Sequence, residues 1–217
     1  AVFSLALGGA VRTVVGVPFM EFLAPGLIVM AIAQNAFANT SSSIVISKVQ
    51  GNIVDTLMPP LSGAEMVLGY LAGGVARGLF VGVTIALALL IFLGIVPAHP
   101  LLALGFIVIG GAFMSGLGMI AGIYANKFDQ MAAITNFIVT PLAFLSGTFY
   151  SVEALPPVLH EITRFNPMFY LIDGVRFGMI GVSDSAPALG LVISLVSVVA
   201  VAAVAWNMLR RGTRLKA

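Results

Sequence analysis

Long apolar segments separated by short polar breaks dominate the pattern along this 217-residue chain. A helix that crosses the roughly 30 Å hydrocarbon core of a bilayer takes about 20 residues. Apolar segments of this length occupy five ranges: 22–47, 65–96, 100–124, 131–150 and 186–208. A further apolar stretch at 1–10 is interpreted as a truncated first span. The segments lack the ten-residue alternation of barrel strands, so the pattern predicts an all-α integral membrane protein with six transmembrane helices.

The stretch 166–180 is also apolar, but as a helix of roughly 21 Å it is too short to span. Asn166 is a suitable N-cap and Pro167 a suitable first helical residue. The preceding stretch carries a second apolar stripe, so we expect a short external helical hairpin over 151–181, re-entrant or interfacial, between spans five and six. Asp173 and Arg176, three residues apart on one helical face, are expected to form an ion pair. The pair either fixes the hairpin or handles substrate.

The first loop, 46–60, has a different character. Its apolar residues recur at three- and four-residue steps, and Pro59–Pro60 ends the pattern, which predicts a short amphipathic helix. This helix either lies in the headgroup layer or docks on a cytoplasmic partner. For docking, the expected contacts are Lys48, Val49, Asn52, Ile53, Asp55 and Leu57.

Composition and charge agree with a membrane protein and give its orientation. Hydrophobic residues make up 60% of the chain and charged residues 8%, and there is no cysteine to form a disulfide or a thiolate metal site. If spans alternate in direction, Arg12, Arg164 and Arg176 fall on one side. The other side carries more basic residues, which predicts that the C-terminus is cytoplasmic. These residues are Lys48, Lys127, Arg210, Arg211, Arg214 and Lys216.

Three polar side chains at expected membrane depth are candidate contacts for a substrate path or for lipid: Asn35, Asn39 and Arg77. The two asparagines share a helical face, and hydrogen bonding between helices is the alternative use. Arg77 lies about 18 Å along its span from Glu65, where it either snorkels and meets carbonyls or holds an anionic headgroup. Small residues recur at four-residue spacing, as in Gly74 and Gly78 of the third span and Gly118 and Gly122 of the fourth. This spacing predicts close approach of helix backbones.

Four segments together resemble one family, the membrane permease subunits of ABC-2-type ATP-driven exporters. They are "FLAPGLIVMA", "GYLAGGVARGLFVG", "TPLAFLSGTFYSVEALPP" and "NPMFYLIDGVRFGMIG". The resemblance covers essentially the whole chain and implies a single ABC-2-type transmembrane domain over 1–217 in a bacterial inner membrane. It also implies a permease dimer, expected to be a homodimer, with two ATP-binding subunits docked on the cytoplasmic side. In that family the first cytoplasmic loop supplies a coupling helix, and the cargo is expected to be a drug, lipid or glycan-like molecule.

The chain itself offers no chemistry for hydrolysing ATP. None of its three lysines lies in a P-loop pattern, so ATP and Mg²⁺ are expected on the partner subunit, and this chain is expected to hold no cofactor, metal or catalytic residue. Membrane lipids are expected as partners and nucleic acid is not. An ion-coupled secondary transporter would bury a titratable group in mid-membrane, whereas every Asp and Glu falls at a span edge or in a loop. An intramembrane protease lacks a base at depth, since His99 and His160 lie in loops. A purely structural membrane subunit is the other alternative.

Overall fold

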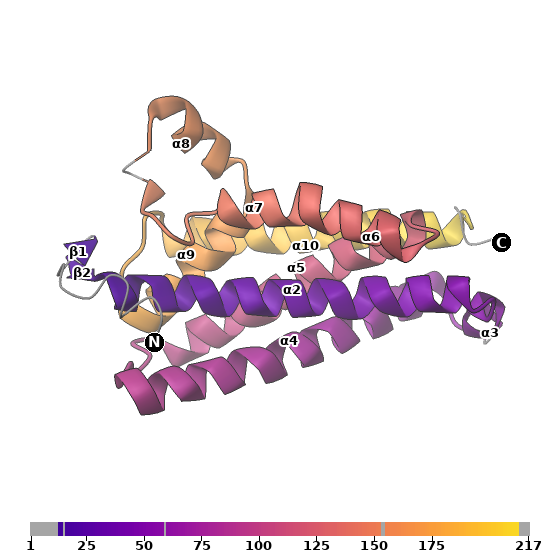
Figure 1. Ribbon diagram of the computed structural model, residues 1–217, viewed down its shortest axis with the longest axis horizontal. Coiled ribbons are helices and arrows are strands. Elements are labelled where there is room, and N and C mark those ends of the chain that lie inside the picture. The colour runs from indigo at the N-terminus through magenta and orange to yellow at the C-terminus, as the bar shows by residue number, and fades with distance from the viewer. Residues whose placement is uncertain (1–12, 15, 59, 153–154, 213–217) are drawn as a thin grey trace.

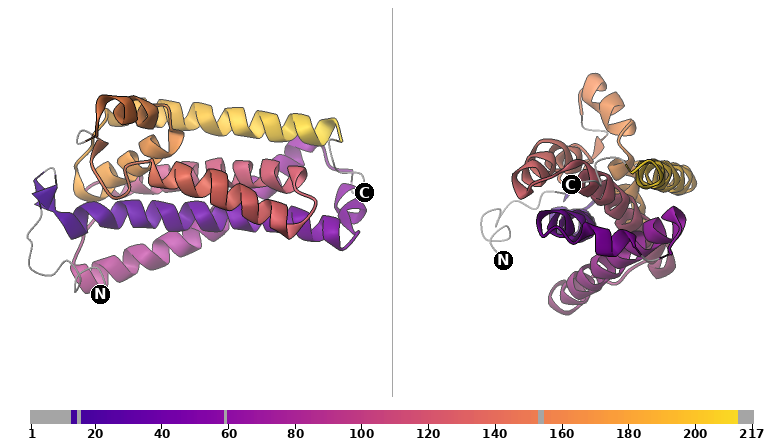
Figure 2. Two further views of the ribbon diagram at one scale, coloured as in Figure 1. Left: turned by 45° about the horizontal axis from the view of Figure 1, so that its top comes forward. Right: turned by 90° about the vertical axis from the view of Figure 1, so that its right-hand side faces the viewer.

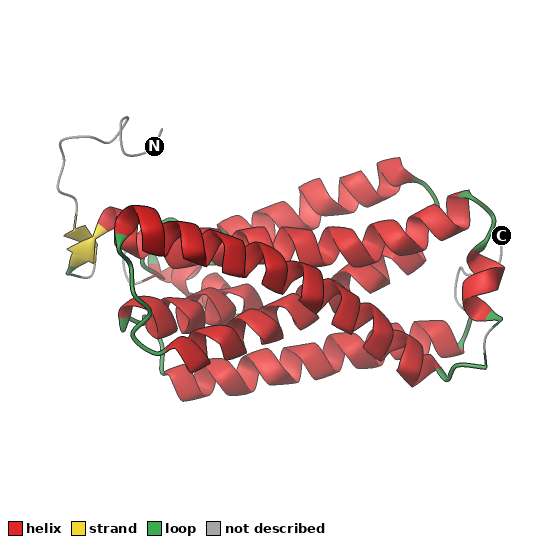
Figure 3. Cartoon of the chain, turned by 90° about the horizontal axis from the view of Figure 1, so that it is seen from below, coloured by secondary structure: helices red, strands yellow, loops and turns green. Residues whose placement is uncertain are grey.

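The computed structural model describes residues 13–14, 16–58, 60–152 and 155–212, which form one elongated bundle of helices along a common axis (Figure 1). Before the bundle, strands β1 (Thr13–Val14) and β2 (Val17–Pro18) pair antiparallel. Figure 3 shows this pair in yellow, before the first long helix. The all-α prediction omitted it because two residues are too few for a periodic signal. The helical segments are α2 Phe19–Val49, α3 Ile53–Leu57, α4 Gly63–Leu93, α5 Pro100–Tyr124, α6 Phe128–Ile134, η1 Thr135–Val139, α7 Thr140–Phe144, α8 Pro157–Arg164, α9 Pro167–Ile180 and α10 Pro187–Arg210.

Four helices among the described residues are long and apolar enough to cross a membrane: α2, α4, α5 and α10. They coincide with four of the predicted spans. The predicted first span at 1–10 lies outside the described residues. The bundle has two distinct ends (Figure 1). We call the end with α3 and the last turn of α10 the α3 end, and the opposite end, with β1, β2, α8 and α9, the α9 end.

The predicted fifth span, 131–150, is a composite of three consecutive segments, α6, the π-helical turn η1 and α7, of 7, 5 and 5 residues. Pro141 in α7 has no N–H to donate to the preceding turn, and a π-helical turn is a common accommodation of such a break. The hydroxyl of Thr140 donates to the carbonyl oxygen of Thr135 at 3.0 Å across the turn. The helix starts earlier and ends earlier than predicted, and at roughly 25 Å it is shorter than α2, α4, α5 and α10.

The core lies where α2 and α5 pack against each other, with α4 and α10 beside them (Figure 2). A Cβ built on Gly118 would lie 2.5 Å from the carbonyl oxygen of Phe37, and one on Gly74 would lie 2.3 Å from Ser115 Oγ. The predicted close approach at these small residues is therefore confirmed. Ser115 Oγ also lies 2.6 Å from Thr40 Oγ1 and donates to the carbonyl oxygen of Tyr70 at 2.9 Å. Ser115 thus ties three helices together.

The two helices of the predicted hairpin differ strongly from each other. Helix α9 packs against α5, α10 and α2, and most of its residues are buried. Helix α8 stands away from the bundle (Figures 1 and 2). Its apolar side chains stay exposed, with Val158 at 71% and Ile162 at 49%, and so does Phe165, which follows the helix, at 86%. Two short helices are thus present over the predicted range, but only α9 is buried in the bundle.

The predicted continuous helix over 46–60 is also wrong. Helix α2 ends at Val49, Gly51 takes a φ of +75°, and α3 begins at Ile53 and runs for five residues. A left-handed φ ends a helix, and Gly adopts it without steric cost. The regular spacing of apolar residues therefore continues through a point where the helix is interrupted, and spacing alone does not reveal the interruption.

Candidate functional site

A cluster of buried polar groups lies at the α9 end, centred on Asp173, whose side chain is 1% exposed. One carboxylate oxygen, Oδ1, accepts the backbone N–H of Asp184 at 2.8 Å. The other oxygen, Oδ2, accepts the hydroxyls of Ser183 and Ser185 at 2.7 and 2.6 Å and the N–H of Ser185 at 2.9 Å. Four donors satisfy the carboxylate, so its burial is compensated. The sequence placed Asp173 correctly in a short helix but did not reveal that it is buried.

Arg176, which is 0% exposed, lies one turn further along α9. Its Nη1 lies 3.9 Å from Asp173 Oδ1 and 4.0 Å from Asp184 Oδ2, and its Nη2 donates to the carbonyl oxygen of Gly147 at 2.7 Å. The guanidinium also stacks 3.9 Å over the ring of Phe22. Its burial lowers the pKa of Arg176, and the carboxylates of Asp184 and Asp173 oppose that shift. One side chain thus joins α2, α9, the turn after α7 and the loop before α10.

Asp184 is the member of this cluster that the sequence reasoning missed. Its carboxylate accepts the hydroxyl of Ser151 and the backbone N–H of Val152, both at 3.0 Å, besides facing Arg176. The available signal was the run "GVSDSAP", in which the side chains flanking Asp184 are hydroxyls that stabilise tight turns. Asn166 adds a further tie, because its Nδ2 donates to the carbonyl oxygen of Leu142 at 2.8 Å while its Oδ1 caps α9.

A second group of polar residues lies on the surface of α2 at mid-helix. We call it the polar face of α2, and it comprises Asn35, Asn39, Ser42 and Ser43, none of them buried. Exposed Arg77 of α4 joins it, with Nη1 3.5 Å from Asn39 Oδ1. Asn35 instead donates to the carbonyl oxygen of Ala31 in its own helix at 2.9 Å. The structure therefore brings together Arg77 and Asn39, and leaves Asn35 on the same face without a contact to Arg77.

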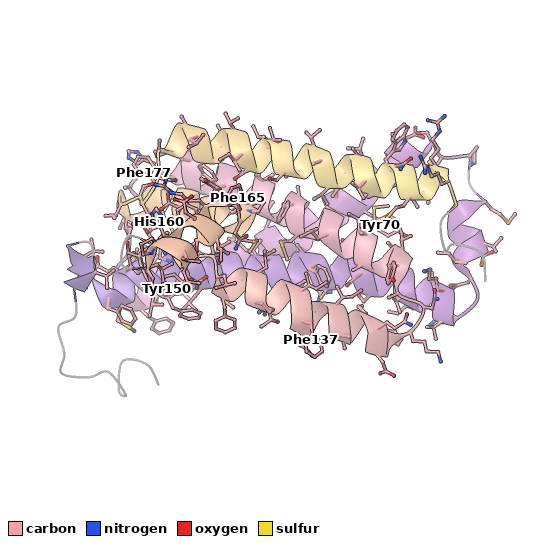
Figure 4. All side chains as sticks on the ribbon, turned by 90° about the horizontal axis from the view of Figure 1, so that it is seen from above. Tyr70, Phe137, Tyr150, His160, Phe165 and Phe177 are labelled. Atoms are coloured by element: carbon pink, nitrogen blue, oxygen red, sulfur yellow. The ribbon has the colours of Figure 1, made fainter. Side chains whose placement is uncertain are left out.

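A cavity of about 170 Å³ opens beside this face, between α2 and the composite fifth span. Gln34 and Ser41 line it from α2, and Thr135 and Thr140 line it from η1 and α7. The outer side of this composite helix faces away from the bundle, where Figure 4 shows Phe137. The side chain of Phe137 is 82% exposed. The cavity thus combines hydroxyl and amide groups with apolar walls.

At the α3 end, the six predicted docking contacts separate into different environments. Ile53 is only 4% exposed and packs against the rest of the chain, whereas Val49 is 54% exposed and Asn52 and Asp55 are exposed. The side chain of Leu57 lies outside the part of the chain that the structure describes. Two apolar residues missing from the prediction, Val54 and Met58, are 56% and 75% exposed. The prediction placed Ile53 on the exposed face because it assumed one continuous helix, whereas the backbone changes direction at Gly51.

Lys48 is engaged within the chain. Its ammonium donates to the carbonyl oxygens of Ile123 and Ala125 and lies 3.5 Å from Asn126 Oδ1. Ile123 and Ala125 belong to the C-terminal end of α5 and the loop that leads into α6. Within the chain, Lys48 therefore joins the last turn of α2 to the C-terminal end of α5. Its predicted contact with a partner subunit stays a prediction.

Aromatic side chains gather at the α9 end. Figure 4 shows Tyr150, His160, Phe165 and Phe177 around α8 and α9. The ring of His99 stacks on Phe177 at 5.2 Å between centroids. Aromatic residues are enriched where a membrane protein meets the interface between hydrocarbon and water.

The four long apolar helices define an integral membrane protein of the all-helical class. Comparison with known proteins gives the family. The family model described as ABC-2 type transporter matches residues 2–180. The chain therefore belongs to the ABC-2 type transporter family and is one of its transmembrane permeases, and the resemblance seen in the sequence is confirmed.

Named relatives agree with this assignment. The chain is 33% identical over 215 residues to the inner membrane transport permease YadH of Escherichia coli K12, an alignment that covers 99% of this chain and 84% of that protein. It is 30% identical over 178 residues to nodulation protein J of Rhizobium leguminosarum bv. viciae, covering 81% and 68% of the two chains. The identity to nodulation protein J of Neorhizobium galegae is 28% over 181 residues, covering 81% and 67%.

Proposed function

We propose that this chain is the permease of an exporter of the bacterial inner membrane, driven by ATP that a separate ATP-binding subunit hydrolyses. Two permease copies and two ATP-binding subunits form the complex, the C-terminus lies in the cytoplasm, and the cargo is a drug, lipid or glycan-like molecule. The chain itself is not an enzyme, since ATP and Mg²⁺ bind to the partner. The family assignment and the inner membrane relative in Escherichia coli support this proposal.

One observation carries the transport function: the polar face of α2 is partly exposed at mid-helix, together with exposed Arg77. A charged or amide side chain in contact with lipid acyl chains costs several kcal/mol, on the order of 2.5–3.5 for Arg at a helix centre. Such groups are tolerated where protein or a water-filled cavity covers them. We infer that this face, with Asn35, Asn39 and Arg77, lines the path of the substrate. Its amides, hydroxyls and guanidinium suit a cargo that carries hydroxyl or anionic groups.

A second part of the proposal concerns the docking of the ATP-binding subunit at the α3 end. Val54 and Met58 present apolar side chains to solvent there, beside exposed Asn52 and Asp55. Burying apolar side chains contributes roughly 25 cal/mol per Å², with polar groups at the rim, as at other protein interfaces. Val49, at the end of α2, is also exposed. The short helix α3 is held directly between two spans, so a push on it reaches α2 and α4.

Thiol labelling tests the substrate path, because the sequence contains no cysteine. Asn39→Cys on the polar face is compared with Val199→Cys, whose position on the long apolar helix α10 is 68% exposed. A membrane-impermeant maleimide reacts with a thiolate, which forms only where water is present. We expect Asn39→Cys to react at least about tenfold faster than Val199→Cys. Equal and negligible labelling of both positions would show that the polar face is dry and contradict the path.

Copurification tests the docking surface. Val54→Asp places a charge on the expected interface and should lower the recovery of an ATP-binding subunit with the tagged full-length protein by at least about tenfold. The matched control is Val158→Asp at the opposite end of the bundle, where the side chain is 71% exposed. Full recovery of the subunit with Val54→Asp would show that α3 is not the dock.

A further inference from the structure

The last turn of α2 and the C-terminal end of α5 are joined by Lys48. Its ammonium donates to the carbonyl oxygens of Ile123 and Ala125, the latter at 3.0 Å, and lies 3.5 Å from Asn126 Oδ1. Ile123 and Ala125 are both 0% exposed. These contacts join two residues 75 and 77 positions away from Lys48 in the sequence.

Helix geometry explains why an ammonium suits this place. The last four carbonyl groups of an α-helix have no partner within the helix, and a buried carbonyl without a partner costs free energy. The C-terminus also carries a partial negative charge, which a cation stabilises. Lys48 supplies three N–H donors on one flexible side chain, so it caps α5 from a neighbouring helix.

The contact continues into the composite fifth span. The backbone N–H of Asn126 donates to Gln130 Oε1 at 2.8 Å, which ties the loop to the first turn of α6. None of the seven residues of α6 is buried, and α6 makes few contacts with α2 and α5. The position of α6 therefore depends strongly on this loop, and the loop is held to the end of α2 by Lys48.

Lys48 also lies close in sequence to α3, the proposed docking surface for the ATP-binding subunit. Helix α3 starts five residues further along, and Ile53 packs its side chain into the permease, so that α3 and the end of α2 are in contact. Beyond α6, the residues Thr135 and Thr140 line the cavity between α2 and the fifth span. A displacement of α3 thus has a physical connection to the cavity wall through Lys48, beside the direct packing of α2 on α6.

We propose that Lys48 is a positioning residue that transmits displacement of the first cytoplasmic loop to the composite fifth span. The inference rests on the proposed function, since it takes the force on α3 from a docked ATP-binding subunit. Lys48 acts by fixing the relative position of α3 and α6. It does not contact the ATP-binding subunit or the cargo.

Hydrogen exchange of the full-length protein with its ATP-binding subunit in nanodiscs tests this role. Exchange is measured with and without trapping by Mg·ATP and vanadate, for the peptides over 53–58 and over 128–144. In the wild type, trapping should change exchange in both regions. In Lys48→Gln the change over 53–58 should remain and the change over 128–144 should be lost. A residue needed only for folding would alter both regions together.

Two variants serve as controls. Lys48→Arg keeps a cation with several donors and should retain the change over 128–144. Lys127→Gln, at an exposed lysine of the same loop, should behave as the wild type. A change over 128–144 that is undiminished in Lys48→Gln would overturn the proposal, and so would loss of the subunit from that variant, because Lys48 would then be a docking contact.

A covalent tie addresses any effect of the substitution on folding. In Lys48→Cys with Asn126→Cys, the change over 128–144 should be absent before and present after reaction with a short bifunctional thiol reagent, in the same purified protein. A full change before cross-linking would contradict the role of Lys48. If trapping leaves 53–58 unaltered in the wild type, the docking in the proposed function is wrong and this inference falls with it.

Discussion

Two arginines within the bundle illustrate opposite uses of a charge in a membrane protein. Arg176 is 0% exposed, faces two carboxylates, donates to a carbonyl oxygen and stacks on Phe22. Arg77 is exposed, with a single contact of 3.5 Å to Asn39 among those described. The carbonyl acceptor, the counter-charges and the aromatic ring around Arg176 come from four segments, so this buried charge holds those segments together. A charge left open on a helix face is available to something outside the chain.

The same contrast applies to the helices that carry the two residues. Helix α9 is too short to span but is buried on most sides, and the serines and aspartates around it satisfy each other. Helix α4 is long enough to span but mostly exposed, with 11% of its apolar window buried. Burial in this protein is therefore independent of whether a helix crosses the membrane. The comparison predicts which substitutions cost stability and which ones cost function.

The largest effect is expected at Arg176. Arg176→Met should lower the stability of the detergent-solubilised protein by about 3–5 kcal/mol, because it leaves two buried carboxylates without their cation. Thermal unfolding followed by size-exclusion chromatography measures this. The control is Arg164→Met at the exposed end of α8, which should change stability by less than about 0.5 kcal/mol. Equal stability of the two variants would contradict the structural role of Arg176.

A double-substitution cycle sharpens this result. Asp173→Ala combined with Arg176→Ala should show a coupling of about 0.5–3 kcal/mol. Rescue should be incomplete, because Asp184 also faces Arg176 and stays buried without it. Strict additivity of the two defects would show that Asp173 and Arg176 do not compensate each other.

An intermediate effect is expected from two neighbouring glycines of α4. A Cβ on Gly74 would lie 2.3 Å from Ser115 Oγ, whereas one on Gly73 would meet only Asn39 Nδ2 at 3.7 Å. Gly74→Ala should therefore destabilise the protein by about 1–3 kcal/mol through overpacking. Gly73→Ala should be neutral or stabilising by up to about 1 kcal/mol, since Ala favours a helix. The same thermal assay compares them, and a reversed order would mean that the wrong face of α4 was assigned to the core.

The smallest effect on stability is expected at Arg77. Arg77→Met should change the free energy of unfolding by less than about 0.5 kcal/mol, because the side chain is exposed and makes one long hydrogen bond. It should nevertheless slow the aqueous labelling of Asn39→Cys, since removing the charge makes the polar face less hydrated. A loss of stability as large as that of Arg176→Met would show that Arg77 is a structural residue as well.

Sequence reasoning succeeded where a feature is local. Asn166 and Pro167 predicted the start of α9, and the apolar lengths predicted α2, α4, α5 and α10. It failed where a single backbone torsion or a distant partner decides. Gly51 breaks the predicted helix over 46–60, and only its φ of +75° reveals this. Asp184 lies in the loop before α10, and the path of a loop cannot be predicted from the spacing of apolar residues.

The sequence by itself determined that this chain crosses a membrane, where its long helices lie and which family it belongs to. These follow from hydropathy and from motifs that each lie within a few tens of residues. Only the tertiary structure decided that Arg176 is buried and Arg77 is open, that Ile53 faces inward, and that Lys48 caps α5. Each of those outcomes depends on which helix faces pack together. Packing brings together residues such as Lys48 and Ile123, which are 75 positions apart in the sequence. A local pattern does not indicate contacts between residues so far apart in the chain.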